Sequence, residues 1–126
     1  MKSIIEHIAL TTRLLGAPVS EAAVSAEVVR DKKLNVNFHS LVEVLRSHGF
    51  ENTLSKRSLE DIPSLAVPVV LILHNEEAAV VTKIEGVGRA RKYHIRQTDG
   101  LAQELDYAQL SVLYLGYCWF IKPKMV

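Results

Sequence analysis

The chain has 126 residues, the size of one domain, and 48% of them are hydrophobic against 23% charged, so the composition excludes a disordered chain. Its 15 Lys and Arg residues nearly balance its 14 Asp and Glu residues, and a net charge of +1 excludes a strong general attraction to nucleic acid or anionic membranes. No apolar run approaches the about 20 residues of a membrane-spanning helix, and the N-terminus lacks the layout of a signal peptide.

The first predicted element is a helix with one buried face. Apolar residues recur at helical spacing between Ile4 and Leu15. Ser3 and Glu6 have the spacing of a capping box, which would make Ser3 the N-cap residue. Gly16 and Pro18 end the helix.

Two further helices are predicted before residue 50. Ser20 opens a short helix in which Val24 and Val28 repeat at helical spacing. The next helix follows Asn37 and closes at Gly49, a residue type that readily adopts the left-handed conformation at a helix end. Its apolar stripe consists of Phe38, Leu41, Val42 and Leu45. The first half is therefore expected to be all helical.

A buried β-hairpin is predicted next. Residues 68–73 form a continuous apolar run, and residues 78–84 are rich in Val and Ile. The polar residues 75–77 separate the two runs and form the connection.

Further strands follow in the second half of the chain. Residues 89–95 predict a third strand, residues 97–100 a turn, and residues 101–105 a short return strand. Asp106 and Gln109 can cap a short helix that runs to Leu113. Residues 117–121 predict a final strand, which Pro123 ends. Helices followed by strands that are close in sequence indicate an α+β fold, with N-terminal helices packed on an antiparallel sheet.

The sequence carries no pattern of a cofactor or metal site. The glycine-rich stretch 86–89 is too short for a phosphate-binding loop and lacks its lysine. The spacing of metal ligands is absent among the five histidines. Each is better read as a surface or core-edge residue; they are His7, His39, His48, His74 and His94. The single cysteine, Cys118, lies in an apolar run and is better read as a core residue of a protein from a reducing compartment than as a nucleophile.

A basic group surrounds Tyr93 in the third predicted strand. Arg89, Arg91 and Arg96, together with Lys92, can face an acidic partner, so Arg89, Arg91, Tyr93 and Arg96 are candidate partner-binding residues. The alternative is that these charges only keep a strand soluble and prevent edge pairing. With one aromatic residue among them, they do not indicate a nucleic-acid site.

Three short sequence segments, together with the order of the predicted elements, resemble those of a known protein family. They are residues 10–16 (LTTRLLG), 59–71 (LEDIPSLAVPVVL) and 114–117 (YLGY). The chain resembles, along nearly its whole length, the bacteriocin-processing (double-glycine leader) cysteine peptidases. The resemblance is to the degenerate form found at the N-terminus of type I secretion ABC exporters of RTX toxins and giant adhesins, as in haemolysin exporters.

The resemblance implies a papain-like fold and assigns positions to a catalytic triad. The nucleophilic cysteine of active members would correspond to Ser3 or a neighbour, and the general-base histidine to Ala78. The orienting aspartate would fall at Arg96 or Gln97. The oxyanion-hole glutamine of the family would lie in an upstream stretch that this chain does not contain. Serine without a base is a poor nucleophile and alanine accepts no proton, so the expectation is a protein that is not an enzyme and needs no cofactor.

The resemblance also implies a role and a location. We expect residues 1–126 to form a single peptidase-like domain, cut from a longer ABC exporter and held at the cytoplasmic side of the bacterial inner membrane. Its partners would be the secreted RTX-type substrate, bound first in a groove between the helices and the sheet, and the rest of the exporter. Two alternatives stay open: a structural or docking module for exporter assembly, and an active peptidase that uses Ser3 or Cys118.

Overall fold

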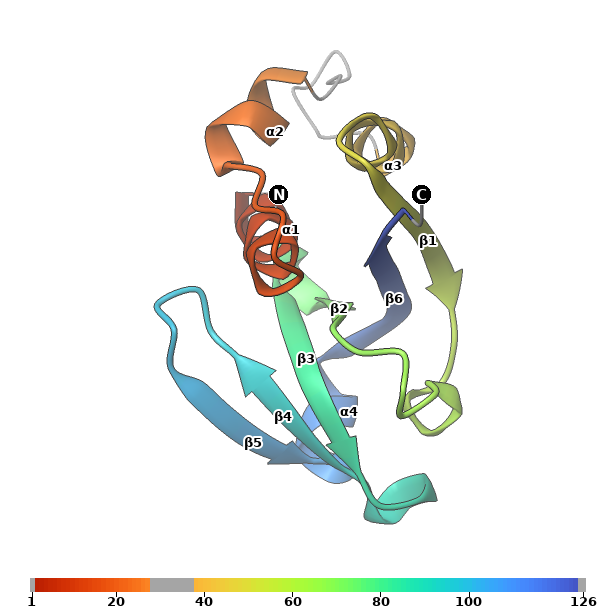
Figure 1. Ribbon diagram of the computed structural model, residues 1–126. Coiled ribbons are helices and arrows are strands. Elements are labelled where there is room, and N and C mark those ends of the chain that lie inside the picture. The colour runs from red at the N-terminus through yellow and green to blue at the C-terminus, as the bar shows by residue number, and fades with distance from the viewer. Residues whose placement is uncertain (1, 28–37, 125–126) are drawn as a thin grey trace.

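The computed structural model describes residues 2–27 and 38–124, which form helices on a six-stranded antiparallel sheet (Figure 1). The helices are α1 (Lys2–Leu14), α2 (Glu21–Glu27), α3 (Phe38–Ser47) and α4 (Tyr107–Leu113). The strands are β1 (Phe50–Lys56), β2 (Val69–Leu73), β3 (Ala78–Glu85), β4 (Lys92–Arg96), β5 (Ala102–Asp106) and β6 (Tyr114–Pro123). Single 3₁₀ turns lie at η1 (Leu59–Asp61), η2 (His74–Glu76) and η3 (Gly88–Ala90). The predicted α+β architecture is confirmed.

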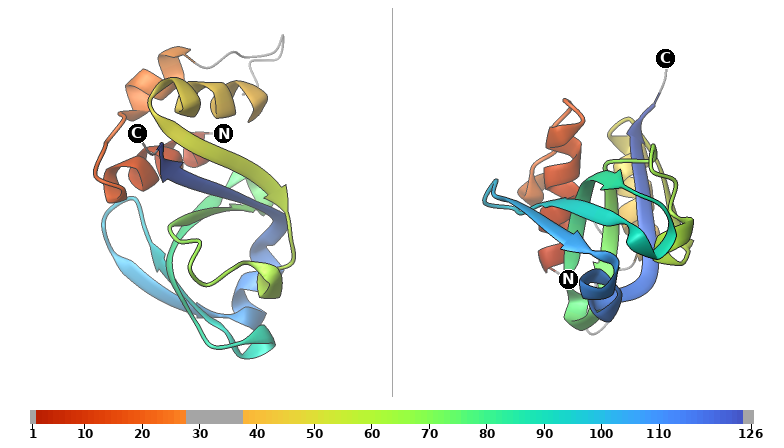
Figure 2. Two further views of the ribbon diagram at one scale, coloured as in Figure 1. Left: turned by 45° about the vertical axis from the view of Figure 1, so that its right-hand side comes forward. Right: turned by 90° about the horizontal axis from the view of Figure 1, so that it is seen from below.

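The strands are ordered β1-β6-β2-β3-β4-β5 across the sheet. Strands β2 and β3 pair as the predicted hairpin, and β4 and β5 pair through the predicted turn, in which the amide of Gly100 donates to the carbonyl of Gln97. The last strand, β6, lies between β1 and β2 and pairs with both (Figure 2).

Each face of the sheet carries its own hydrophobic core, because successive side chains of a strand point to opposite faces. On one face α1, α2 and α3 cover Val70 and Val80 together with Trp119, which is fully buried. On the other face the segment that follows β1 and the short helix α4 cover Leu71, Val81 and Cys118 (Figure 2).

Several local predictions are confirmed. The Ser20 hydroxyl accepts a hydrogen bond from the Ala23 amide at the start of α2, and Asp106 and Gln109 form a complete capping box at the start of α4. Gly49 closes α3 with a φ of 89°. Val28 and Asn37, which the sequence places in and before predicted helices, lie outside the described residues.

Three local predictions are wrong. Helix α1 begins at Lys2, so Ser3 lies inside its first turn and is not the N-cap. The first half is not all helical, because β1 spans Phe50–Lys56. The third strand starts at Lys92 instead of residue 89, since the chain first makes the turn η3.

No helix within residues 2–27 and 38–124 combines the length and the apolar character that crossing a membrane requires. In the same part of the chain, no three His, Cys, Asp or Glu side chains come together as potential metal ligands.

Candidate functional site

The first turn of α1 meets the start of β3. The Ser3 hydroxyl donates a hydrogen bond of 2.8 Å to Oε2 of Glu77, the residue before Ala78. Ala78, the first residue of β3, and Ile4 of α1 belong to the same buried cluster. Two of the three positions that the family resemblance assigned are therefore neighbours in space.

The third position takes part in a different set of contacts. Gln97 follows β4, and its Nε2 donates to Oε1 of Gln103 at 3.1 Å. Its backbone amide donates to the carbonyl of Leu101 at 2.8 Å. Gln97 thus stabilises the turn between β4 and β5, and no hydrogen bond in the described part of the chain links it to Ser3.

His7, which the sequence predicts to be a surface or core-edge residue, lies one helical turn after Ser3. Its Nδ1 is 2.6 Å from the carbonyl oxygen of Ser3 and 3.4 Å from the Ser3 hydroxyl. A carbonyl oxygen can only accept a hydrogen bond, so Nδ1 carries a hydrogen and donates it to the backbone. That nitrogen is then unable to accept the hydroxyl proton of Ser3.

The hydrogen bonds around Ser3 differ from those of a serine nucleophile. In a Ser-His hydrolase, an unprotonated imidazole nitrogen accepts the proton of the attacking hydroxyl. Here the hydroxyl donates to a carboxylate, and the nearby imidazole donates to the backbone. The i, i+4 spacing of Ser3 and His7 was the sequence signal for this contact, because residues four apart lie on one helix face.

Cys118 is the other candidate nucleophile, and it lies in the core. It is fully buried on β6, and its thiol contacts the carbonyl oxygen of Ser55 at 3.6 Å. Burial raises the pKa of the Cys118 thiol, which disfavours the reactive thiolate.

We expect the Cys118 thiol to be unreactive in the folded protein. With Ellman's reagent at pH 8, the native chain should be labelled at least about a hundredfold more slowly than the chain unfolded in guanidinium, since the folded state buries the thiol and raises its pKa. Equal rates in the two states would contradict the buried position of this side chain.

The basic group around Tyr93 is not exposed as a whole. Arg91 is buried and donates to the carbonyl oxygens of Leu59 and Ile62 at 2.9 and 2.6 Å. Tyr93 is also buried, with its hydroxyl donating to Leu59 O at 3.2 Å. The expectation that both side chains face a partner is wrong, because they hold the segment that follows β1 against the sheet.

The other two members of the basic group are more accessible. Arg89 is exposed in η3, with its guanidinium 5.8 Å from the centre of the Tyr107 ring. Arg96 is half-buried at the end of β4. These two residues lie in different elements and do not form one basic surface with Arg91.

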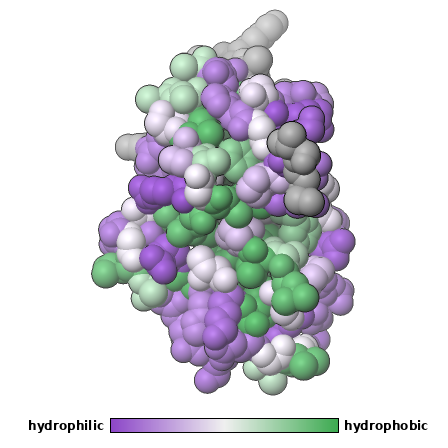
Figure 3. Space-filling view, viewed as in Figure 1, coloured by the Kyte–Doolittle hydropathy of each residue, from purple (hydrophilic) through white to green (hydrophobic). Residues whose placement is uncertain are grey.

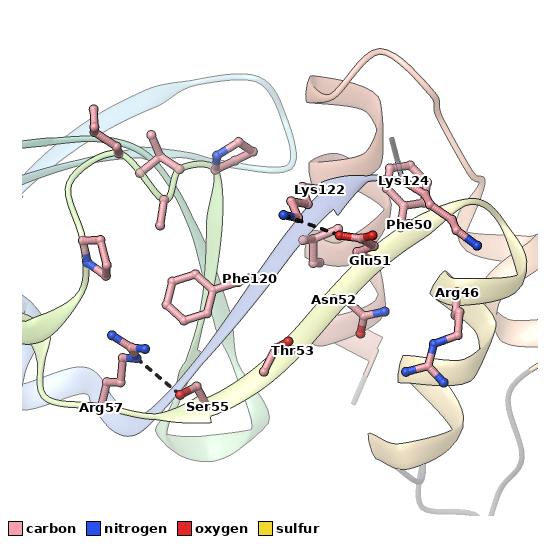
Figure 4. A pocket seen from close by; sticks show the side chains of 16 residues that line it. Arg46, Phe50, Glu51, Asn52, Thr53, Ser55, Arg57, Phe120, Lys122 and Lys124 are labelled. Carbon is pink, nitrogen blue, oxygen red and sulfur yellow. Dashed lines mark hydrogen bonds and ion pairs between the residues drawn. The ribbon is translucent and has the colours of Figure 1, made fainter. Parts of the chain in front are cut away.

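A groove of about 890 Å³ opens between β1, β6 and the segment that leads from η1 to β2 (Figure 4). Phe120 of β6 and Thr53 of β1 lie directly opposite each other there, and both contribute to the lining. The far wall is residues 63–68. Hydrophobic residues gather across the middle of the face seen in Figure 3, with hydrophilic residues around them.

A smaller hollow of about 520 Å³ lies where a groove between the helices and the sheet was expected. It is bordered by α1, by the segment leading into α2, and by Thr98 of the turn between β4 and β5. Its charged lining residues are Arg13, Glu6 and Glu21. The larger groove, with more positive charge, lies along β1 and β6.

No protein-family model matches this sequence, and no curated protein matches it either. Solved structures do match. The N-terminal peptidase C39-like domain of the toxin secretion ATP-binding protein from Vibrio parahaemolyticus superposes with a TM-score of 0.77 at 18% identity, covering 97% of both chains.

Two peptidase domains of ABC transporters give similar agreement. The peptidase domain of Streptococcus ComA, a bi-functional transporter of a quorum-sensing pathway, has a TM-score of 0.75 at 16% identity, over 98% of this chain and 93% of that one. A double-glycine motif protease from an AMS/PCAT transporter, solved with its leader peptide, has a TM-score of 0.73 at 13% identity, over 98% and 86%. At these identities the likeness shows the fold: that of the papain-like C39 peptidase domain.

Proposed function

We propose that this chain is a peptidase-like domain without peptidase activity, which binds or positions the secreted protein for a type I ABC exporter. The observation that carries the proposal is the hydrogen bonding of Ser3. Its hydroxyl donates to Glu77 while the neighbouring imidazole of His7 donates to the backbone, within a fold shared with transporter peptidase domains. The domain would act on the cytoplasmic side of the bacterial inner membrane, with an RTX-type protein as its substrate.

The solved structures with this fold support a role in binding polypeptide. One of them is described as part of a toxin secretion protein, and another holds a leader peptide. A domain that keeps this fold without the chemistry would retain a surface for an unfolded chain.

The absence of catalysis is tested by giving the site a better nucleophile. We expect neither the native chain nor Ser3→Cys to cleave a double-glycine leader peptide, because a thiol at this position still lacks an imidazole that can accept its proton. Mass spectrometry after overnight incubation would detect cleavage, with an active double-glycine peptidase as the positive control. Cleavage by Ser3→Cys would show that a base is within reach and would contradict the proposal.

Substrate binding is tested by NMR with the isolated chain. Titration of the ¹⁵N-labelled chain with unfolded segments of an RTX-type protein should shift amide resonances along one continuous surface. A spectrum that stays unchanged at millimolar ligand would overturn substrate binding.

A second candidate function is a docking module for assembly of the exporter. It is favoured by three neighbouring apolar residues at the end of α4 and the start of β6, Val112, Leu113 and Leu115, which are 75%, 44% and 47% exposed. An exporter that lacks the domain separates the two functions. If the complex assembles but secretion stops, the domain handles substrate; if assembly fails, it is a docking module.

A further inference from the structure

The groove along β1 and β6 has a partly apolar floor. The Phe120 ring lies in its centre (Figure 4), and Pro63, Val67 and Pro68 line the opposite wall. Leu65 borders the groove and is 95% exposed, the highest value among the large apolar residues of the described chain. An open groove with apolar side chains accommodates the alternate side chains of an extended peptide.

The charges around this groove are mostly positive. Four cations line it, namely Arg46, Arg57, Lys122 and Lys124, against one carboxylate, Glu51. Lys122 pairs with Glu51 at 3.4 Å, and Arg46 pairs with Glu43 at 2.7 Å.

Arg57 and Lys124 carry the positive charge that remains. Neither makes an ion pair within the described residues. The Arg57 guanidinium lies over the Phe120 ring, 5.4 Å from its centre, and its contact with Asp61 is to the backbone carbonyl. Its charge is therefore held at the groove without being neutralised.

The two unpaired cations mark opposite ends of the groove. Figure 4 shows Arg57 at one end and Lys124 at the other, with Phe120 between them. Arg57 directly follows the seven-residue strand β1, and Lys124 lies beside the start of that strand, where its amide donates to the carbonyl of Gly49. An extended chain advances about 3.3 Å per residue, so a segment about as long as β1, about seven residues, would reach from one cation to the other.

We propose that this groove binds an extended, acidic segment of the secreted protein, with apolar side chains on Phe120 and carboxylates at Arg57 and Lys124. The proposal rests on the function proposed above and names the kind of segment recognised and the place where it binds. A peptide fits better than a nucleic acid, because the groove combines one aromatic ring with an aliphatic wall and the chain carries a net charge of only +1.

The test uses a fluorescein-labelled peptide of about seven residues with alternating aspartate and leucine, a length chosen from the groove. The comparison probes are the same peptide with lysine in place of aspartate and an oligothymidine of similar length. We expect the full chain to bind the acidic peptide more tightly than either comparison probe, and to bind it more weakly as salt is raised, since exposed charge pairs are screened.

The decisive variant reverses the charge at both unpaired cations by combining Arg57→Glu with Lys124→Glu. It should weaken binding of the acidic peptide by about tenfold or more, through lost attraction and added repulsion. The matched control is Arg13→Glu with Lys83→Glu, which has the same net charge but alters cations outside this groove. A neutral pair, Arg57→Gln with Lys124→Gln, should give a smaller loss and serves if charge reversal impairs folding.

Each other result overturns the groove assignment. An equal loss in both charge-reversed proteins would indicate a non-specific charge effect, and tighter binding of oligothymidine would indicate a nucleic-acid site. Unchanged binding in the groove variants would place the peptide elsewhere. If an RTX-type segment still shifts NMR resonances outside the groove, substrate binding stands and the groove proposal falls; if no substrate segment binds, the proposed function itself fails.

Discussion

Replacing Trp119 with alanine should lower the free energy of unfolding by about 3–5 kcal/mol, the range for removing a large aromatic side chain from a core. Trp119 is fully buried on β6 beneath the helices. Its Nε1 donates to Oδ1 of Asn52 at 2.8 Å, and its ring lies 6.0 Å from that of Phe38 at an angle of 60°. The substitution would leave a cavity where helix and strand meet, and urea unfolding followed by circular dichroism would measure the change.

Two controls separate the effect of the cavity from other causes. Tyr117→Ala, on the same strand but 39% exposed, should cost clearly less than Trp119→Ala. Trp119→Phe should give an intermediate loss, because it keeps an aromatic ring but leaves Asn52 without its donor. A loss below about 1 kcal/mol for Trp119→Ala would be inconsistent with a buried indole at this position.

Arg91→Ala should destabilise the protein by about 3–6 kcal/mol, since it removes two hydrogen bonds from a charged donor and each contributes about 1.5–3 kcal/mol. The guanidinium of Arg91 donates to the carbonyls of Leu59 and Ile62, and both acceptors would lose this partner on substitution. These bonds fix η1 and the start of the wall at residues 63–68. Beyond the global loss, hydrogen exchange of the Asp61 and Ile62 amides should accelerate.

The matched control is Arg89→Ala, which removes an exposed arginine two residues away and should cost less than about 1 kcal/mol. Arg91→Ala should also weaken binding of the acidic peptide, because the wall of the groove loses its attachment, whereas Arg89→Ala should leave binding unchanged. If both variants have the same stability and the same exchange rates, Arg91 does not hold the wall.

Local patterns in the sequence predicted most of the helices and hairpins. The apolar stripe of Leu41 and Leu45 predicted α3, and the contrast between the polar residues 75–77 and their apolar neighbours predicted the β2–β3 hairpin. In each case the periodicity of a single segment held the information.

Strand β1 was missed because an inward position carries a polar residue. Phe50 and Leu54 face the helices, but Asn52 lies between them and breaks the apolar alternation. Asn52 is accommodated through distant partners: it accepts from Trp119 and donates to the Val42 carbonyl at 3.1 Å. Neither partner is near in sequence, so the pattern of residues 50–56 alone did not predict a strand.

The basic strand was misread for a related reason. Arg91, Tyr93 and Ile95 alternate with Lys92 and His94, and period two places the first three on one face. Tyr93 and Ile95 are apolar enough to indicate that this face is buried, but an arginine normally indicates an exposed one. What allows Arg91 to be buried is the pair of carbonyl acceptors near residue 60, which only the folded chain brings to it.

The place of β6 in the sheet has a consequence for how the protein is made. Strands β1 and β2 do not pair with each other; each pairs with β6, which follows all the other described strands in sequence. During translation the ribosome releases β1 and β2 long before β6, so both remain without this partner until residues 114–123 have left the exit tunnel. The sheet therefore becomes continuous only after β6 has emerged, and until then the nascent chain exposes unpaired strand edges, which make such species prone to aggregation.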